Sequence, residues 1–306
     1  MLLGLNAGFG APLGAELELI HGLGFAFVRQ DLRADASDAV IRRILADHRR
    51  SPVGLLALLA GGEISHPSGR RVEPHELAAH GARVVRLAAE AGVWRLMIEV
   101  GNEPDIGHVD YRERPQDFAV AVRYTVEAVR QAGYGGVVIS GGISNLSPRA
   151  LRYLERMCDA GLPDGVAVGF HRYPRGMGPR TPQRGFRSRE AEWEALGRVA
   201  AGRPVACTEL GHHTAPRPTR FLGIFPVRRR VSDQAVADHM EYDLRFFAER
   251  GCLLTAVFQW NDGPRPDLHV DRYGLRRRDG SLKPVAARIA AISRAGWVPA
   301  RKEPAS

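Results

Sequence analysis

The chain has 306 residues, of which 44% are hydrophobic and 25% are charged, so it has enough apolar material for the core of a large globular domain. No apolar run reaches the roughly 18 residues that a membrane span needs, which excludes a membrane protein of that kind. The formal net charge is +9, and nearly all of the basic charge is arginine, because Lys283 and Lys302 are the only lysines. Such a charge permits an anionic partner without requiring one.

The apolar start, MLLGLNAGFG, has no basic segment and no small-residue cleavage site, so we expect a strand there and not a signal peptide. This predicts a cytoplasmic protein or the mature form of a secreted one. The three cysteines, Cys158, Cys207 and Cys252, are odd in number and far apart, which predicts buried free thiols and excludes a disulfide framework. No CxxC pattern is present, and we expect neither a metal nor another cofactor.

The predicted elements alternate along the chain between short apolar runs and amphipathic helices. The runs are nearly continuous in apolar residues, as strands covered on both faces are, and they lie at 2–6, 25–30, 53–60, 95–100, 136–140, 165–170, 204–209 and 253–260. Apolar residues with a 3.6-residue period predict the clearest helices at 38–49, 74–91, 117–132, 148–159, 232–250 and 284–293. Ser37, Ser147 and Ser232 stand where N-cap residues are preferred.

This repeated alternation predicts an α/β fold of the (β/α)8 TIM-barrel type, in preference to a doubly wound sheet. The barrel would form a single domain over residues 1–300, followed by a disordered tail at 301–306. Active sites of such barrels lie at the carboxyl ends of the strands. The residues that end each apolar run are therefore the candidates for chemistry.

Polar side chains gather at five of these strand ends. The fourth run stops at Asn102 and Glu103, because Pro104 cannot donate to a sheet, and the seventh stops at Glu209. The other three ends are Arg29-Gln30-Asp31, His171-Arg172-Tyr173 and Gln259-Trp260-Asn261-Asp262. Two carboxylates among hydrogen-bonding and aromatic side chains favour cleavage of a glycosidic bond, in which one acid protonates the leaving oxygen and the other attacks the sugar carbon or activates water.

Five motifs resemble those of the retaining glycoside hydrolases of clan A, the cellulase-like barrels of the family 5 and family 39 type. NEP at 102–104 is similar to the acid/base motif of that clan, and TELG at 208–211 to its nucleophile motif. FHRYP, FQW and GLRRRDGSLKPVAARI resemble, in turn, the strand-six signature, the strand-eight tryptophan and the run into the last helix. Together they extend from residue 102 to residue 289.

The resemblance implies a retaining β-glycoside hydrolase that acts by double displacement, with Glu103 as general acid/base and Glu209 as nucleophile. The implied substrate-binding residues are Asn102 on the sugar 2-hydroxyl, Arg29 and Tyr173 beside Glu209, His171 lining the site, and Trp260 as the platform on which the sugar stacks. The alternative interpretations are structural: core packing by Trp260, a buried structural His171, and an ion pair of Arg29 with Asp31 or a nearby glutamate.

Three other functions stay open at this point. The same residues are compatible with an inactive barrel that binds glycans, and with a transglycosylase. A metal-dependent hydrolase is disfavoured, because the strand ends are poor in clustered His and Asp. HELAAH at 75–80 spaces its histidines five residues apart, which puts them on different sides of a helix and predicts no shared metal.

Arginine-rich loops are expected after the sixth, seventh and eighth predicted strands, at 172–190, 210–231 and 265–278. A solvated surface is one interpretation, and a cleft for an acidic glycan is another, because guanidinium groups pair bidentately with carboxylate, sulfate and phosphate. Few aromatic residues are interleaved with these arginines, which argues against nucleic acid. The expected partner is a carbohydrate, neutral or acidic, with no nucleic acid and no membrane, and the oligomeric state is left open.

Overall fold

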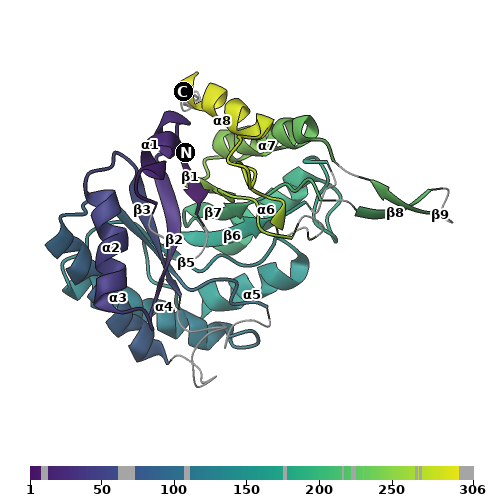
Figure 1. Cartoon of the computed structure of the whole chain (residues 1–306). Coiled ribbons are helices and arrows are strands. Elements are labelled where there is room, and N and C mark those ends of the chain that lie inside the picture. Colours follow the sequence, from purple (N-terminus) through teal and green to yellow (C-terminus); the bar gives the residue numbers. More distant parts are fainter. Residues whose placement is uncertain are drawn as a thin grey trace, which may run out of the picture.

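A computed structural model describes residues 1–7, 13–60, 73–106, 111–174, 178–215, 217–221, 225–229, 231–265, 268 and 271–295 (Figure 1). The predicted (β/α)8 barrel is confirmed. Its eight parallel strands are β1 (Leu2–Asn6), β2 (Phe27–Arg33), β3 (Gly54–Ala60), β4 (Leu96–Val100), β5 (Val138–Ser140), β6 (Val168–Arg172), β7 (Val205–Leu210) and β10 (Leu254–Phe258). They form one sheet in the order β5-β4-β3-β2-β1-β10-β7-β6.

Backbone hydrogen bonds between the two outermost strands of this order close the barrel. Ser140 donates to the carbonyl of Ala167 over 2.9 Å, and His171 donates to the carbonyl of Ile143 over 2.8 Å. Isolated parallel bridges join the same two segments. Closure places the carboxyl ends of β4 and β7, which are more than a hundred residues apart in sequence, on the same rim.

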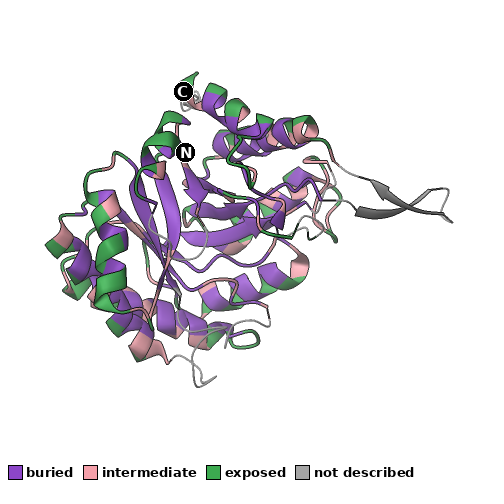
Figure 2. Ribbon diagram, viewed as in Figure 1, coloured by how far each residue is buried: buried purple, intermediate pink, exposed green. Residues whose placement is uncertain are grey.

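Eight helices within the described residues surround the barrel, with buried inner and exposed outer faces (Figure 2). They are α1 (Glu16–Gly22), α2 (Asp38–Arg49), α3 (Pro74–Ala91), α4 (Pro115–Gln131), α5 (Pro148–Asp159), α6 (Arg189–Ala200), α7 (Asp233–Glu249) and α8 (Pro284–Arg294). The hydroxyls of Ser37, Ser147 and Ser232 each accept a first-turn N–H, which explains why α2, α5 and α7 begin as predicted. The six clearest predicted helices, the ones for which the apolar periodicity gave bounds, do not include α1 and α6. In α6 the buried face includes Arg189 and Glu192, which interrupt the apolar periodicity.

Two predicted segments differ from the structure. Residues 210–231, expected as a loop, contain an antiparallel hairpin of β8 (Arg217–Phe221) and β9 (Phe225–Arg229), which projects away from the barrel (Figure 1). The eighth barrel strand ends at Phe258 and does not extend to Trp260. The predicted tail at 301–306 lies outside the described residues.

The barrel interior is layered. Alternate residues of the strands point inward and form an apolar lower layer of Phe27, Leu56, Ile139, Ala167, Ala206, Leu254 and Ala256. Gly4 leaves room for the Phe27 ring, because a Cβ there would lie 2.1 Å from it. On β2 the inward positions above Phe27 are Arg29 and Asp31, so charged groups succeed apolar ones toward the carboxyl rim.

Cys207 and Cys252 are buried free thiols, as expected, whereas the free thiol of Cys158 is only partly buried. Among the described residues, no helix has the length and apolar character needed to cross a membrane.

Candidate active site

A buried arginine organises the polar layer of the barrel. Arg29, 2% exposed, donates through Nε and Nη2 to the two carboxylate oxygens of Glu99 on β4. Its Nη1 lies 2.8 Å from Oε1 of Glu209, and its Nη2 lies 2.8 Å from Oδ1 of Asn102. Burial opposes the charged form, but Glu99 and Glu209 outweigh it and raise the pKa of Arg29. A permanent positive charge therefore stands between two carboxylates.

Glu209 is aimed into the barrel by an irregularity in β7. Phe170 pairs with Cys207 but His171 pairs with Glu209, so Thr208 is an extra residue, and the pairing of β7 with β10 shifts at the same place. A bulge of this kind re-aims the side chain that follows it. The Glu209 carboxylate then accepts hydrogen bonds from Arg29, from Asn6 Nδ2 at 3.5 Å and from the phenol of Tyr173.

Tyr173 is a dedicated donor to Glu209. Burial and the adjacent Glu209 charge raise the pKa of the Tyr173 phenol well above its usual value. The phenol therefore keeps its proton at neutral pH. Its ring is held edge-on against Phe258 and Tyr273, at centroid distances of 5.7 Å and 5.2 Å.

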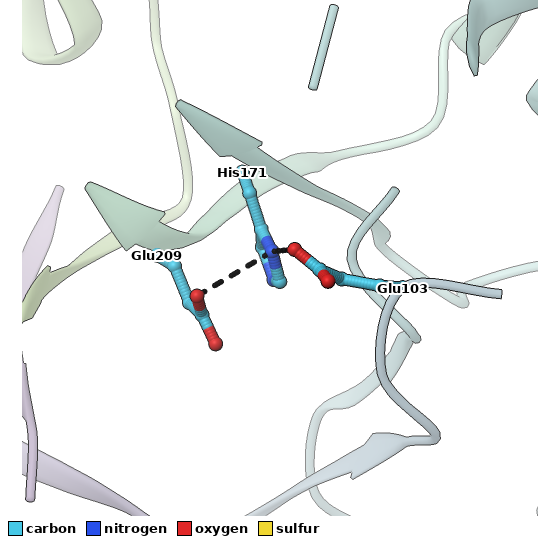
Figure 3. A group of neighbouring side chains, drawn as sticks. All are labelled: Glu103, His171 and Glu209. Carbon is cyan, nitrogen blue, oxygen red and sulfur yellow. Dashed lines mark hydrogen bonds and ion pairs between the residues drawn. The ribbon is translucent and has the colours of Figure 1, made fainter. Parts of the chain in front are cut away.

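Glu103 reaches the rim through a left-handed turn after β4. Gly101 and Glu103 have φ values of +75° and +43°, and the Glu103 N–H donates to the Gly142 carbonyl over 3.0 Å. A left-handed conformation is uncommon for a residue with a side chain, and here it turns the carboxyl back over the barrel mouth (Figure 3). The Glu103 side chain is 23% exposed, against 10% for Glu209.

His171 connects the two carboxylates. Its Nδ1 lies 3.0 Å from Oε1 of Glu103 and 3.5 Å from Oε2 of Glu209 (Figure 3). Burial alone would lower the pKa of this imidazole, but Glu209 and Glu103 outweigh burial and raise it. The site thus favours a protonated His171.

The same three side chains have the geometry of a potential metal site. One ligand atom from each of Glu103, His171 and Glu209 lies within 4.8 Å of the others. A cation there would compete with the Arg29 guanidinium, already 2.8 Å from Glu209, and with the proton that the carboxylates favour on His171. The positive charge beside these carboxylates is therefore supplied by the Arg29 guanidinium and the His171 proton, which disfavours a metal cation at the same place.

Trp260 corrects a sequence expectation. Its ring is completely buried, its indole N–H donates to Oε2 of Glu16 over 2.6 Å, and the Arg276 guanidinium lies 5.2 Å from its centroid. A stacking platform needs an exposed ring face, so the structure contradicts that role for Trp260 and supports the alternative of core packing. The partly exposed aromatic beside Tyr173 is Phe258, the last residue of β10.

Other residues of the site were not identified from the sequence as functional. Glu99 and Asn6 are buried on inward positions beside Arg29 and Glu209. A charged residue inside an apolar strand and an amide ending another are the signals that could have found them. Asp31 lies on the inward face of β2, two residues beyond Arg29, and is partly exposed. Burial raises the pKa of Asp31 to about 6.

Most described arginines of residues 172–190 and 265–278, for which a solvated surface and an acidic-glycan cleft were both left open, are neutralised by carboxylates within the chain. Arg172 and Arg189 are buried with Glu192 and Asp243 (Arg172 at 3.2 and 3.6 Å, Arg189 at 3.2 and 2.9 Å). Nearer the surface, Arg265 pairs with Asp271, Arg276 with Glu16 and Arg277 with Asp233. The side chains of 216–230 lie outside the described residues. The paired arginines give no support for recognition of acidic groups by these loops.

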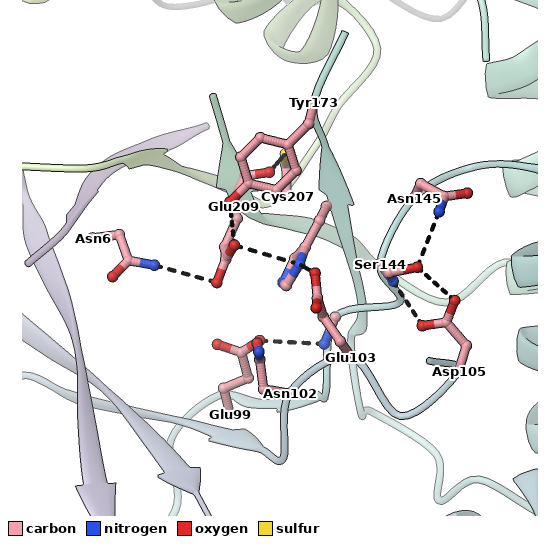
Figure 4. A network of polar contacts seen from close by, with 12 residues as sticks. Asn6, Glu99, Asn102, Glu103, Asp105, Ser144, Asn145, Tyr173, Cys207 and Glu209 are labelled. Atoms are coloured by element: carbon pink, nitrogen blue, oxygen red, sulfur yellow. Dashed lines mark hydrogen bonds and ion pairs between the residues drawn. The ribbon is translucent and has the colours of Figure 1, made fainter. Parts of the chain in front are cut away.

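The polar network around the site continues beyond Glu103. Asp105 accepts hydrogen bonds from both the N–H and the hydroxyl of Ser144, each over 2.7 Å, and Asn145 donates to the same hydroxyl. In Figure 4 these residues lie on the side of Glu103 that faces away from Glu209. The loops after β4 and β5 are therefore tied together directly behind Glu103.

No family model matches this sequence, and no curated protein matches it. Solved structures with a similar fold include a family 39 glycoside hydrolase from the gut symbiont Bacteroides cellulosilyticus WH2, with a TM-score of 0.71 at 16% identity over 95% of this chain and 63% of that one. A monomeric β-xylosidase from Caulobacter crescentus CB15 has a TM-score of 0.68 at 15% identity, over 95% of this chain and 67% of that one. An endo-β-1,4-glucanase from Xanthomonas axonopodis pv. citri has a TM-score of 0.68 at 14% identity, over 96% of this chain and 99% of that one.

The chain spans 59–66% of the length of three of the matching structures. At identities of 13–16% the similarity establishes the fold. The protein therefore shares the (β/α)8 barrel fold of these glycoside hydrolases.

Proposed function

We propose that this protein is a retaining β-glycoside hydrolase, with Glu209 as nucleophile and Glu103 as general acid/base. The observation that carries the proposal is the placement of these two carboxylates across the barrel mouth, with an oxygen of each within 4.8 Å of the other. Retaining enzymes need carboxyl groups about 5–5.5 Å apart, whereas inverting enzymes need about 6.5–9.5 Å to admit a water. The short separation favours the retaining mechanism.

The surroundings of the two acids support different roles for them. Glu209 accepts hydrogen bonds from Arg29, Tyr173 and Asn6, which hold its carboxylate in one orientation, as a nucleophile requires. Glu103 is more exposed, and its carboxylate contacts His171. An acid with this exposure can exchange a proton with a leaving group and with water, as a general acid/base requires.

The reaction follows in two displacements. A Glu209 oxygen attacks the anomeric carbon, the bond from that carbon to the leaving oxygen breaks, and the Glu103 proton passes to the leaving oxygen. Water then gives its proton to Glu103 and attacks the same carbon, which releases the sugar and restores the Glu209 carboxylate. Asn102, oriented by Arg29 through its Oδ1, has its amide nitrogen available for the sugar 2-hydroxyl. Phe258 and Tyr173 provide the aromatic wall.

The test is release of reducing sugar from a panel of neutral and acidic β-glycans, with wild type, Glu209→Gln and Glu103→Gln. The expected loss in kcat for Glu209→Gln is at least about 10³-fold, because the nucleophile is removed. Azide should restore activity to the Glu103→Ala variant with an activated substrate. Azide is an anionic nucleophile, so its attack on the glycosyl intermediate needs no general base. NMR of the first product anomer should show retained configuration, and inversion would overturn the mechanism.

The alternatives predict different outcomes. An inactive barrel would bind glycans without releasing sugar from any of them, in wild type as in the variants. A transglycosylase would transfer the sugar to an added glycoside acceptor faster than to water. Dialysis against EDTA should leave the activity unchanged. If EDTA instead abolished the activity and a divalent ion restored it, Glu103, His171 and Glu209 would be metal ligands of a metal-dependent hydrolase.

A further inference from the structure

A second polar pocket lies outside the catalytic residues, next to the loop that carries Glu103. Its volume is about 320 Å³, within the range of small-molecule sites. Four of its lining residues are arginines: Arg149, Arg152 and Arg156 from α5, and Arg112 from the segment before α4. Asp105 and Glu113 also line it, so the lining carries a net positive charge even with both carboxylates ionised.

These four arginines are exposed, and their guanidinium groups lack the intramolecular partners that several other arginines of this protein have. None of them forms a hydrogen bond or ion pair with another residue in the part of the chain that the structure describes. By contrast, Arg172, Arg189, Arg276 and Arg277 all pair with carboxylates. The N–H donors of the four pocket arginines are therefore available to a ligand in the pocket.

The stability of α5 does not explain the cluster. Arg149, Arg152 and Arg156 are spaced at i, i+3 and i+7, which places like charges side by side on one helix face. Arg149 also lies in the first turn, where the helix dipole disfavours a cation. The repulsion among the arginines and the unfavourable charge at the helix N-terminus both destabilise α5. An anion bound among the three arginines would neutralise their charge and relieve both effects.

The position of the pocket connects it with the catalytic cleft. Asp105 lines the pocket and lies two residues beyond Glu103. Asp105 is held by Ser144 on the side of Glu103 that faces away from Glu209 (Figure 4). A general acid contacts the leaving-group oxygen, so the leaving-group part of a substrate lies toward Glu103.

We propose that this arginine pocket binds an oxyanion (carboxylate, sulfate or phosphate) and that the anion is carried on the leaving-group side of a glycan held in the cleft. Guanidinium forks match the geometry of such groups bidentately. The oxyanion site is inferred from the residues that line the pocket. Its link to the leaving group rests on the proposed glycosidase function. This places the recognition of an acidic substrate on α5 and not on the loops after β6 and β10.

Isothermal titration at low ionic strength tests the oxyanion site without hydrolysis. Inorganic phosphate is titrated into wild type, into Arg149→Gln/Arg152→Gln, and into the loop variant Arg112→Gln, which leaves α5 unchanged. The matched control is Arg43→Gln/Arg86→Gln, which removes the same charge from exposed positions of α2 and α3. We expect each pocket variant to weaken binding by about tenfold or more, and the control to change it less than about twofold. Equal binding by all four proteins, or none by wild type, overturns the pocket.

A second titration distinguishes the source of the anion. A β-linked disaccharide with a uronate at its reducing end and its neutral counterpart are titrated into Glu209→Gln, with and without the Arg149→Gln/Arg152→Gln changes. Tighter binding of the uronate by about tenfold, lost with the pocket arginines, supports a glycan anion. Equal binding of the two disaccharides, with phosphate still bound, assigns the pocket to a free anion and overturns its link to the cleft. Phosphate binding in a protein that hydrolyses nothing would leave the pocket intact while refuting the glycosidase.

Discussion

The phenol of Tyr173, at the end of β6, donates a hydrogen bond to the Glu209 carboxylate on the neighbouring strand β7. The contact depends on the extra residue in β7 that brings Glu209 opposite His171, and on Phe258 and Tyr273, which pack against the phenol ring. A strand irregularity and an aromatic cluster thus combine to direct one hydrogen-bond donor at the proposed nucleophile.

Tyr173→Phe should lower kcat by about 10- to 10²-fold, because Glu209 loses a donor that lies beside the reacting carbon. The ring and its packing remain, so the free energy of unfolding should change by no more than about 1–3 kcal/mol. Steady-state kinetics and urea unfolding measure the two quantities. Tyr134→Phe is the control, since that half-buried phenol donates to the carbonyls of Leu96 and Val137 instead. Equal effects of both changes on kcat would contradict a specific role for Tyr173.

His171→Gln should reduce stability more in acid than in base. The pKa of His171 is raised in the folded protein, so its stabilising effect is fully present below the unfolded value near 6.5 and disappears as the pH rises through the folded value. We expect His171→Gln to decrease the free energy of unfolding more at pH 5.5 than at pH 9, by about 1 kcal/mol or more. Urea unfolding at both pH values measures it. Burial lowers the pKa of His48, so His48→Gln should show the opposite trend, and the same trend in both variants would refute the charge on His171.

Asp31→Asn should stabilise the protein relative to wild type as the pH rises. Burial raises the pKa of Asp31 from 3.8 to about 6, so the folded state takes up a proton between these values and wild type loses stability as the pH rises through them. The difference between variant and wild type should therefore shift by about 1–3 kcal/mol between pH 4.5 and pH 7.5. Thermal and urea unfolding at the two pH values test this, and a difference that does not depend on pH rules it out.

Phe258→Ala and Trp260→Phe should separate aromatic substrate contact from core packing. Phe258 is partly exposed beside Tyr173, so we expect its truncation to lower kcat/KM by about tenfold or more. Trp260 is buried and bonded to Glu16, so its replacement should cost about 1–3 kcal/mol of stability and leave kcat/KM within about threefold. The reverse pattern would restore Trp260 as the sugar platform.

The sequence by itself determined the alternation of strands and helices, and with it the barrel and the rim on which Glu103 and Glu209 lie. Apolar runs, serine caps and Pro104 act locally, so they can be interpreted without knowing what packs where. The tertiary structure decided which side chains meet. The inward-outward alternation of a strand holds only as far as the strand does, so Trp260, two residues beyond the end of β10, could not be oriented from its spacing.

Barrel closure also decided the partners of each charge. Arg172, the last residue of β6, pairs with Glu192 on α6 and Asp243 on α7, while the arginines of α5 face a pocket. Both sets look alike in sequence, because a guanidinium next to an acid in space is seldom next to it along the chain. Only the packing of helices separated by tens of residues distinguishes a neutralised arginine from one that can bind a ligand.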